Sequence, residues 1–178
     1  MIPAPTRSIA AQQGAANNLI GLTLGLLALV VGLTALLLLC DVLFPNLVGR
    51  ARRNAEQMPI RSFVVGLINF VFFGLIAVAL LSGDEGAKLI GLAVGTILLS
   101  FFAVGLAVVG RLIGERLRPN DDSAVRQMLA GALTLELAAL VPLVGWFAVP
   151  ALAGLIGYGA TVIALIRRRA PPIAALEE

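Results

Sequence analysis

The sequence is dominated by apolar runs that are too long to be buried inside a small water-soluble domain. The first extends from Leu19 to Cys40 without a charged residue. An α-helix rises about 1.5 Å per residue, so about 20 apolar residues cross the roughly 30 Å hydrocarbon core of a bilayer. Over the whole chain, 60% of residues are hydrophobic and 13% are charged, whereas soluble domains have about 45–50% and about 25%. The chain is therefore predicted to be an all-α integral membrane protein.

Three later apolar segments continue the pattern. Ile60–Leu81 and Lys88–Gly110 are each long enough for one crossing, whereas Ala124–Ile166 is too long for one. Proline interrupts a helix and glycine permits a tight turn. We therefore expect the last segment to turn back on itself at Pro142, Gly145 and Trp146.

The resulting prediction is a bundle of about five transmembrane helices, with the last two forming a hairpin broken at Pro142–Gly145. The alternative is four spans plus a re-entrant half-helix. Residues 1–18 are expected to form a flexible polar N-terminal tail. Residues 19–169 would then be a single transmembrane helical domain, and residues 170–178 a short C-terminal tail.

Arginine placement favours the five-span topology. Three clusters hold most of the basic residues: Arg50, Arg52, Arg53 and Arg61; Arg111, Arg116, Arg118 and Arg126; and Arg167, Arg168 and Arg169. With five spans, eleven of the 13 basic residues lie on one side; with four spans the division is eight to five. The positive-inside rule then places the N-terminus outside and the C-terminus in the cytoplasm of a bacterial inner (plasma) membrane.

The same clusters are suited to anionic lipid headgroups, so we expect lipid rather than nucleic acid as the partner of the basic residues. This role, together with the control of topology, is assigned to Arg50, Arg52, Arg53, Arg61, Arg116, Arg118, Arg167, Arg168 and Arg169.

Composition argues against most kinds of enzyme. The chain has no histidine and a single cysteine, Cys40. This excludes His-ligated haem or zinc, a Ser-His-Asp triad and an intrachain disulfide. Because no nucleophile–base pair or metal-ligand cluster is evident, we expect no catalytic residue, metal or cofactor.

Glu136 is the only ionisable residue near the middle of a predicted span. Burial without a cation disfavours a charged carboxylate, so we expect a neutral side chain that donates a hydrogen bond to a carbonyl or to Asn69. The alternative is a proton or cation site. Two further polar residues within spans, Thr96 and Ser100, are expected with Asn69 to tie helices together.

Small residues recur at helical spacing. Such stripes let helix backbones approach closely in lipid, and they predict either packing within the chain or oligomerisation. The residues are Gly21 and Gly25, then Gly91 and Gly95, then Ala153, Gly157 and Thr161, with Gly110 and Gly114 at the end of the third span.

Residues 46–58 predict a short amphipathic helix at the cytoplasmic interface. Its apolar positions are Leu47, Ala51, Ala55 and Met58, whereas Arg50 and Arg53 lie on another face. The alternative is a solvated connector that only fixes topology.

Two segments, PNLVGRARRNAEQMPIRSFVVGLINFVF and ALTLELAALVPLVGWFAVPALAGLIGYGATVIALIRRR, lie within residues 45–169. They resemble the membrane region of bacterial polymer-forming, bactofilin-like membrane proteins. The matching features are a Pro-x-x-Gly-Trp break at Pro142, Gly145 and Trp146 and an Arg-rich end at Arg167–Arg169. The resemblance implies an outside N-terminus. Because these residues contain no β-repeat segment, it does not extend to the polymerising function.

Together these features predict a non-enzymatic membrane protein. It would act as a scaffold, assembly factor or accessory subunit through helix–helix contacts, either as a homo-oligomer or within a larger membrane complex. The alternative is a small transporter or channel that uses Glu136.

Overall fold

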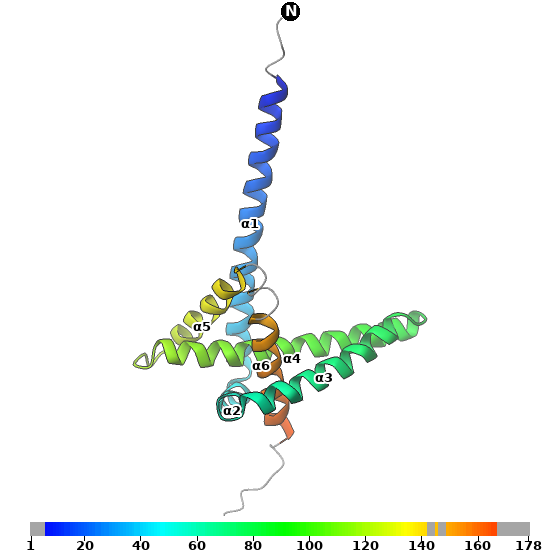
Figure 1. The fold of residues 1–178 in the computed structure, drawn as a ribbon, viewed down its shortest axis with the longest axis vertical. Coiled ribbons are helices and arrows are strands. Elements are labelled where there is room, and N and C mark those ends of the chain that lie inside the picture. Colours follow the sequence, from blue (N-terminus) through cyan, green and yellow to red (C-terminus); the bar gives the residue numbers. More distant parts are fainter. Residues whose placement is uncertain (1–5, 142–144, 146–148, 167–178) are drawn as a thin grey trace, which may run out of the picture.

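The computed structural model describes residues 6–141, Gly145 and residues 149–166. Six helices and no strand are found in these residues (Figure 1). The helices are α1 (Thr6–Leu43), α2 (Pro45–Gln57), α3 (Pro59–Leu81), α4 (Glu85–Leu117), α5 (Ala124–Ala139) and α6 (Val149–Ile166).

Three of these helices contain segments that are long and apolar enough to cross a membrane: Asn17–Leu43, Pro59–Leu81 and Glu85–Leu117. The prediction of an all-helical fold with helices long and apolar enough to span a membrane is therefore confirmed for the described residues. Helices α5 and α6 have 16 and 18 residues. At 1.5 Å per residue they are about 24 and 27 Å long.

The helices diverge from a common centre instead of forming one parallel bundle (Figure 1). Helix α6 packs against α2, α3 and α4, while α5 packs against α4 and α1. The upper part of α1 extends away from this centre, and α3 and α4 form an arm that crosses the direction of α1.

The arm is joined at its tip by a short capped turn. The Asp84 side chain accepts a hydrogen bond from the Ala87 amide at 3.2 Å and caps the start of α4. A cap of this kind satisfies an otherwise free amide of the first turn.

Small and medium apolar residues make up the core where the helices meet. Leu37 and Cys40 of α1 contact this cluster, together with Val48 of α2, Val108 of α4 and Met128 of α5. All are nearly inaccessible to solvent. The predicted amphipathic segment is thus a helix, but its apolar face contacts protein instead of lipid. Met58, expected on that face, is exposed.

Glycine permits the closest helix contacts. At three helix crossings, a Cβ added to either glycine would collide with the backbone of the other helix, so larger residues would push the helices apart. The pairs are Gly66–Gly159 between α3 and α6, Gly105–Gly157 between α4 and α6, and Gly114–Gly131 between α4 and α5.

The structure differs from the sequence prediction at three elements. Thr6–Asn18, expected to be a flexible tail, continues α1; this segment has four alanines and no proline, and it extends a strong apolar helix. Helix α4 continues to Leu117, beyond the predicted end at Gly110. Helices α5 and α6 are separate, as the proline–glycine break predicts, but they make few contacts with each other. Each instead packs mainly against α4 or other helices, so they do not form a closely packed hairpin.

Candidate functional site

Glu136 is buried at the contact between α1 and α5. The Thr34 hydroxyl donates a hydrogen bond to Glu136 Oε1 at 2.7 Å. The two residues are only 8% and 5% exposed. Glu136 Oε2 is also buried and has no hydrogen-bond partner among the described residues. A buried polar atom without a partner is costly, so this carboxyl group is the most unusual polar feature of the interior.

Neither of the two partners expected for Glu136, a carbonyl or Asn69, bonds it among the described residues. Asn69 donates to Val65 O of its own helix at 3.0 Å. Thr96 and Ser100 likewise bond carbonyls four residues earlier, at Leu92 and Thr96. Each of these three side chains bonds a carbonyl of its own helix, so the hydrogen bonds described for them do not tie helices together.

A chain of alternating charges joins three helices beside this site. Arg111 Nη1 of α4 bonds both carboxylate oxygens of Asp41 of α1, at 2.7 and 2.9 Å. Its Nε donates to Glu115 Oε1 at 3.2 Å. Glu115 also pairs with Arg52 of α2. The contact between Arg111 and Asp41 is a charge-assisted hydrogen bond, in which one nitrogen is shared by both carboxylate oxygens, and it fixes the end of α1 to α4.

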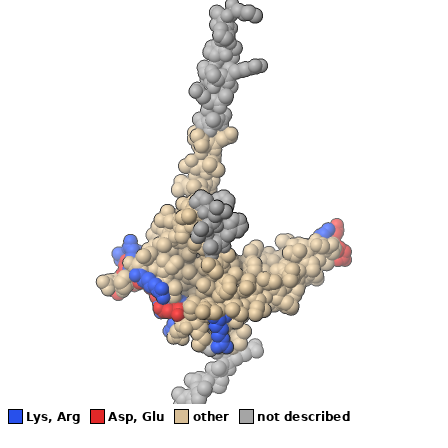
Figure 2. Space-filling view, viewed as in Figure 1, with Lys and Arg blue, Asp and Glu red and all other residues tan. Residues whose placement is uncertain are grey.

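Other arginines assigned to lipid contact also have acidic partners. Arg116 pairs with Glu56 at 3.7 Å, and Arg118 with Asp121 at 3.4 Å. In contrast, no ion pair is found for Arg50, Arg53 or Arg61 within the described residues. Charged atoms gather toward the α2 end of the molecule and at the tip of the arm, with a long uncharged surface between them (Figure 2).

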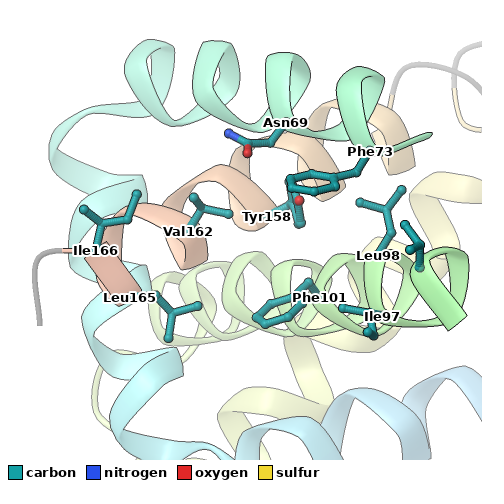
Figure 3. Close-up of a pocket in the computed structure, with 10 residues that line it drawn as sticks. Asn69, Phe73, Ile97, Leu98, Phe101, Tyr158, Val162, Leu165 and Ile166 are labelled. Carbon is teal, nitrogen blue, oxygen red and sulfur yellow. The ribbon is translucent and has the colours of Figure 1, made fainter. Parts of the chain in front are cut away.

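The largely apolar cavity between α3, α4 and α6 has a volume of about 400 Å³. Phe73, Phe101 and Val162 line it together with aliphatic side chains (Figure 3). Asn69 and Tyr158 supply its polar groups. We call this space the apolar cavity.

The predicted packing stripes have different outcomes. A Cβ on Gly91 would meet Ala77 and Leu80 of α3, and Gly157 contacts α4. Ala153 and Thr161 are buried on α6. A Cβ added at Gly21, Gly25 or Gly95 would meet nothing within 4 Å. These last three therefore have no packing role in the described part of the chain.

Some predicted residues lie outside the described residues, namely Pro142, Trp146 and Arg167–Arg169. Gly145 is described and buried, and its amide donates to Val141 O at 2.8 Å. A Cβ there would collide with the end of α5 at Ala138 and Ala139. No group of three or more His, Cys, Asp or Glu suited to a metal is found among the described residues.

Sequence reasoning missed Thr34 and Glu115. Thr34 is one of two threonines in an apolar run, and nothing in the run indicates that α5 packs beside it. Glu115 did carry a signal, because it lies four residues after Arg111, the spacing at which charges pair on one helix face.

Comparison with known proteins gives one match. A family model described as a domain of unknown function matches residues 3–170. No curated protein and no solved structure matches the chain. The resemblance to bactofilin-like membrane proteins therefore stays a prediction.

Proposed function

Starting from the membership of this chain in the family described as domain of unknown function DUF8173, we propose a non-enzymatic role in the membrane. The protein would act as a scaffold, assembly factor or accessory subunit through helix–helix contacts. The observation that supports this proposal most strongly is the uncovered small-residue face of α1.

One face of α1 packs on the core. Thr34, Leu37 and Asp41 are buried there and are spaced by three and four residues, which places them on one side of a helix. The Thr34–Glu136 hydrogen bond and the Asp41–Arg111 pair hold this side against α5 and α4.

The opposite face of α1 carries small residues. Ala28 and Leu37 are nine residues apart, which is two and a half turns at 3.6 residues per turn, so they point in opposite directions. Gly21, Gly25 and Gly32 lie on the Ala28 side and are exposed. We call Gly21, Gly25, Ala28 and Gly32 the α1 stripe.

The α1 stripe is suited to a second helix. In lipid, helix association depends on close packing instead of a hydrophobic drive, and small residues at this spacing allow close approach. All three glycines of the stripe have open space where a Cβ would be. The glycines at the three internal helix crossings, in contrast, are tightly covered.

The test compares two substitutions in the same turn of α1. Gly25→Leu fills the stripe, whereas Thr23→Leu adds bulk on the opposite face, where Thr23 is also exposed. We expect Gly25→Leu to abolish crosslinking through a cysteine at Ala28 in native membranes, with Cys40 replaced, and Thr23→Leu to preserve it. A solitary wild-type monomer with no crosslinked partner would contradict the scaffold proposal, as would equal loss in both variants.

A second candidate function is a small transporter or channel. It is favoured by Glu136 Oε2, a buried carboxyl oxygen that has no hydrogen-bond partner among the described residues. Intramembrane carboxyl groups commonly mark ion or proton pathways. This alternative needs a path for water or ions to reach Glu136, and its test is given with the residue itself in the Discussion.

A further inference from the structure

The apolar cavity continues toward the basic end of the molecule. A second cavity, of about 450 Å³, shares Phe101 and Leu165 with it and is bounded by the α1–α2 junction at Phe44, Pro45 and Arg50. We call this the junction cavity. Phe101 and Leu165 therefore form the boundary between two adjacent spaces.

The junction cavity in turn meets a basic mouth. This third hollow, of about 380 Å³, shares Pro45, Asn46 and Arg50 with the junction cavity and adds Gly49 and Arg53. Among the described residues, no acidic side chain lines any of the three spaces. Each space thus shares lining residues with the next one. The lining is largely apolar in the first space and includes two arginines in the last.

The two arginines retain donors for an anion. Arg50 uses its Nε to bond Asn46 O at 3.0 Å, which orients the guanidinium and leaves its terminal nitrogens without a described partner. Arg53 has no ion-pair partner among the described residues and is exposed. Arginine recognises phosphate through parallel N–H donors. The mouth also lies at the start of α2, whose partial positive charge favours an anion.

We propose that the three spaces form one binding site for an anionic phospholipid. Its phosphate would contact Arg50 and Arg53 at the mouth. An acyl chain would extend through the junction cavity into the apolar cavity between α3, α4 and α6. The volumes fall within the range of about 300–1,000 Å³ typical of small-molecule sites.

The shape of the site supports this occupant over a soluble one. An inorganic phosphate would use only the mouth, and a lipid without a phosphate would use only the apolar lining. The choline cation of a zwitterionic phosphatidylcholine would lie close to the two arginines and oppose its binding. An anionic phospholipid matches both chemistries in the order in which the cavities present them. The proposal requires only that the chain lie in a membrane, and it is independent of the scaffold proposal.

The first experiment measures lipid retention by native mass spectrometry. Detergent-solubilised protein is incubated with mixed micelles that contain phosphatidylglycerol or phosphatidylcholine. We expect selective retention of phosphatidylglycerol. The attraction between one basic side chain and an anionic lipid surface changes the binding affinity about fivefold. We therefore expect Arg50→Gln and Arg53→Gln each to weaken phosphatidylglycerol retention about fivefold. Arg61→Gln is the matched control, since Arg61 is an exposed arginine in the first turn of α3 that lines none of the three spaces.

The second experiment separates a lipid site from a phosphate site. Ile97 lines the apolar cavity and is 58% exposed. We therefore expect Ile97→Phe to narrow the apolar cavity while leaving the core intact. We expect this variant to weaken phosphatidylglycerol retention, and inorganic phosphate to be a poor competitor. Equal retention of the two lipids, a loss in Arg61→Gln as large as in Arg50→Gln, or full displacement by inorganic phosphate would each overturn the proposal.

Discussion

At the scale of single residues, the Thr34–Glu136 contact shows what can be inferred from a sequence read one helix at a time. Glu136 is conspicuous because it is the one carboxylic acid deep in an apolar stretch, and its burial is confirmed. Its partner depends on which helix packs beside α5. That helix is α1, 102 positions earlier. Local pattern cannot reveal such a pairing, because it is set by the packing of all the helices.

The contact predicts a measurable coupling between the two side chains. Interhelical hydrogen bonds in membranes contribute about 0.6 kcal/mol on average and at most about 1.7 kcal/mol. A double-mutant cycle of Thr34→Val with Glu136→Leu, measured by unfolding in mixed micelles, should give a coupling in this range, because each single substitution removes the hydrogen bond. Asn69→Leu with Glu136→Leu is the control and should give none, because Asn69 bonds its own helix. Coupling to Asn69 and not to Thr34 would show that the α1–α5 contact is absent in the membrane.

The same residue separates the two candidate functions. Glu136→Gln preserves the shape of the side chain and its contact with Thr34, so a scaffold should assemble normally. A transporter should lose proton- or cation-coupled flux in vesicles that contain a pH-sensitive dye. Flux in the wild type that is abolished by Glu136→Gln would replace the scaffold proposal with the transporter.

At the scale of helices, the type of element was predictable, whereas the contacts and some of the lengths were not: α4 continues to Leu117, seven residues beyond the predicted Gly110. The bounds of α3 differ from the predicted Ile60–Leu81 by one residue, and the break before α6 was marked by Pro142 and Gly145. The stripe at Gly21 and Gly25, however, contacts nothing described, whereas Gly66 and Gly131, in no noted stripe, permit close crossings. The reason is physical: spacing gives a glycine its helix face, but the element opposite that face is a tertiary property.

The stability of the turn between α4 and α5 is predicted to depend on pH. The Ser123 amide donates to Asp121 Oδ1 at 3.1 Å. This bond, with Arg126 and Arg118 nearby, holds the pKa of Asp121 below its ordinary value. A carboxylate with a lowered pKa stabilises the turn fully above the ordinary aspartate value of about 4, and this stabilisation is lost as the pH falls through the folded-state pKa.

Hydrogen exchange of the peptide that covers residues 118–127 tests this prediction. After correction for intrinsic exchange rates, protection in the wild type should fall as the pH is lowered below the ordinary aspartate pKa of about 4. Asp121→Asn should exchange faster at neutral pH and lose this dependence. Asp122→Asn is the matched control and should behave as the wild type, since no hydrogen bond is described for that side chain. Identical profiles for the two variants would argue against the role of Asp121.

At the scale of the whole molecule, the sequence predicted the environment better than the architecture. Long apolar helices follow from composition, but the divergence of α1 from the α3–α4 arm does not. Hydropathy treats each span alone against a flat bilayer, and on that basis it predicts a bundle. In the structure, the close glycine crossings and the Asp41–Arg111 pair set the angles at which helices meet. Such contacts are non-local and leave little trace in hydropathy.

The final prediction concerns the number of membrane crossings. In a Cys40→Ala background, single cysteines at Gln12, Gly86, Asn120 and Ala174 are labelled from either side of the membrane. Gly86 and Asn120 lie at opposite ends of α4, so they should lie on opposite sides of the membrane in every topology in which α4 crosses it. Five spans place Gln12 and Gly86 outside and Asn120 and Ala174 inside, in agreement with the arginine distribution. Labelling of Gln12 and Ala174 from the same side would instead restore four spans with a re-entrant segment.

A fifth cysteine, at Leu143, completes the test. Helix α5 is about 24 Å long, somewhat shorter than a hydrocarbon core of about 30 Å. Local thinning of the bilayer can accommodate a helix of this length, so with five spans Leu143 is labelled from outside. If α5 and α6 both remain on the cytoplasmic side, Ala174 still lies inside but Leu143 is labelled from inside as well. Five crossings are therefore expected to give outside labelling of Leu143 together with inside labelling of Ala174. An arrangement in which only α1, α3 and α4 cross the membrane cannot produce this result.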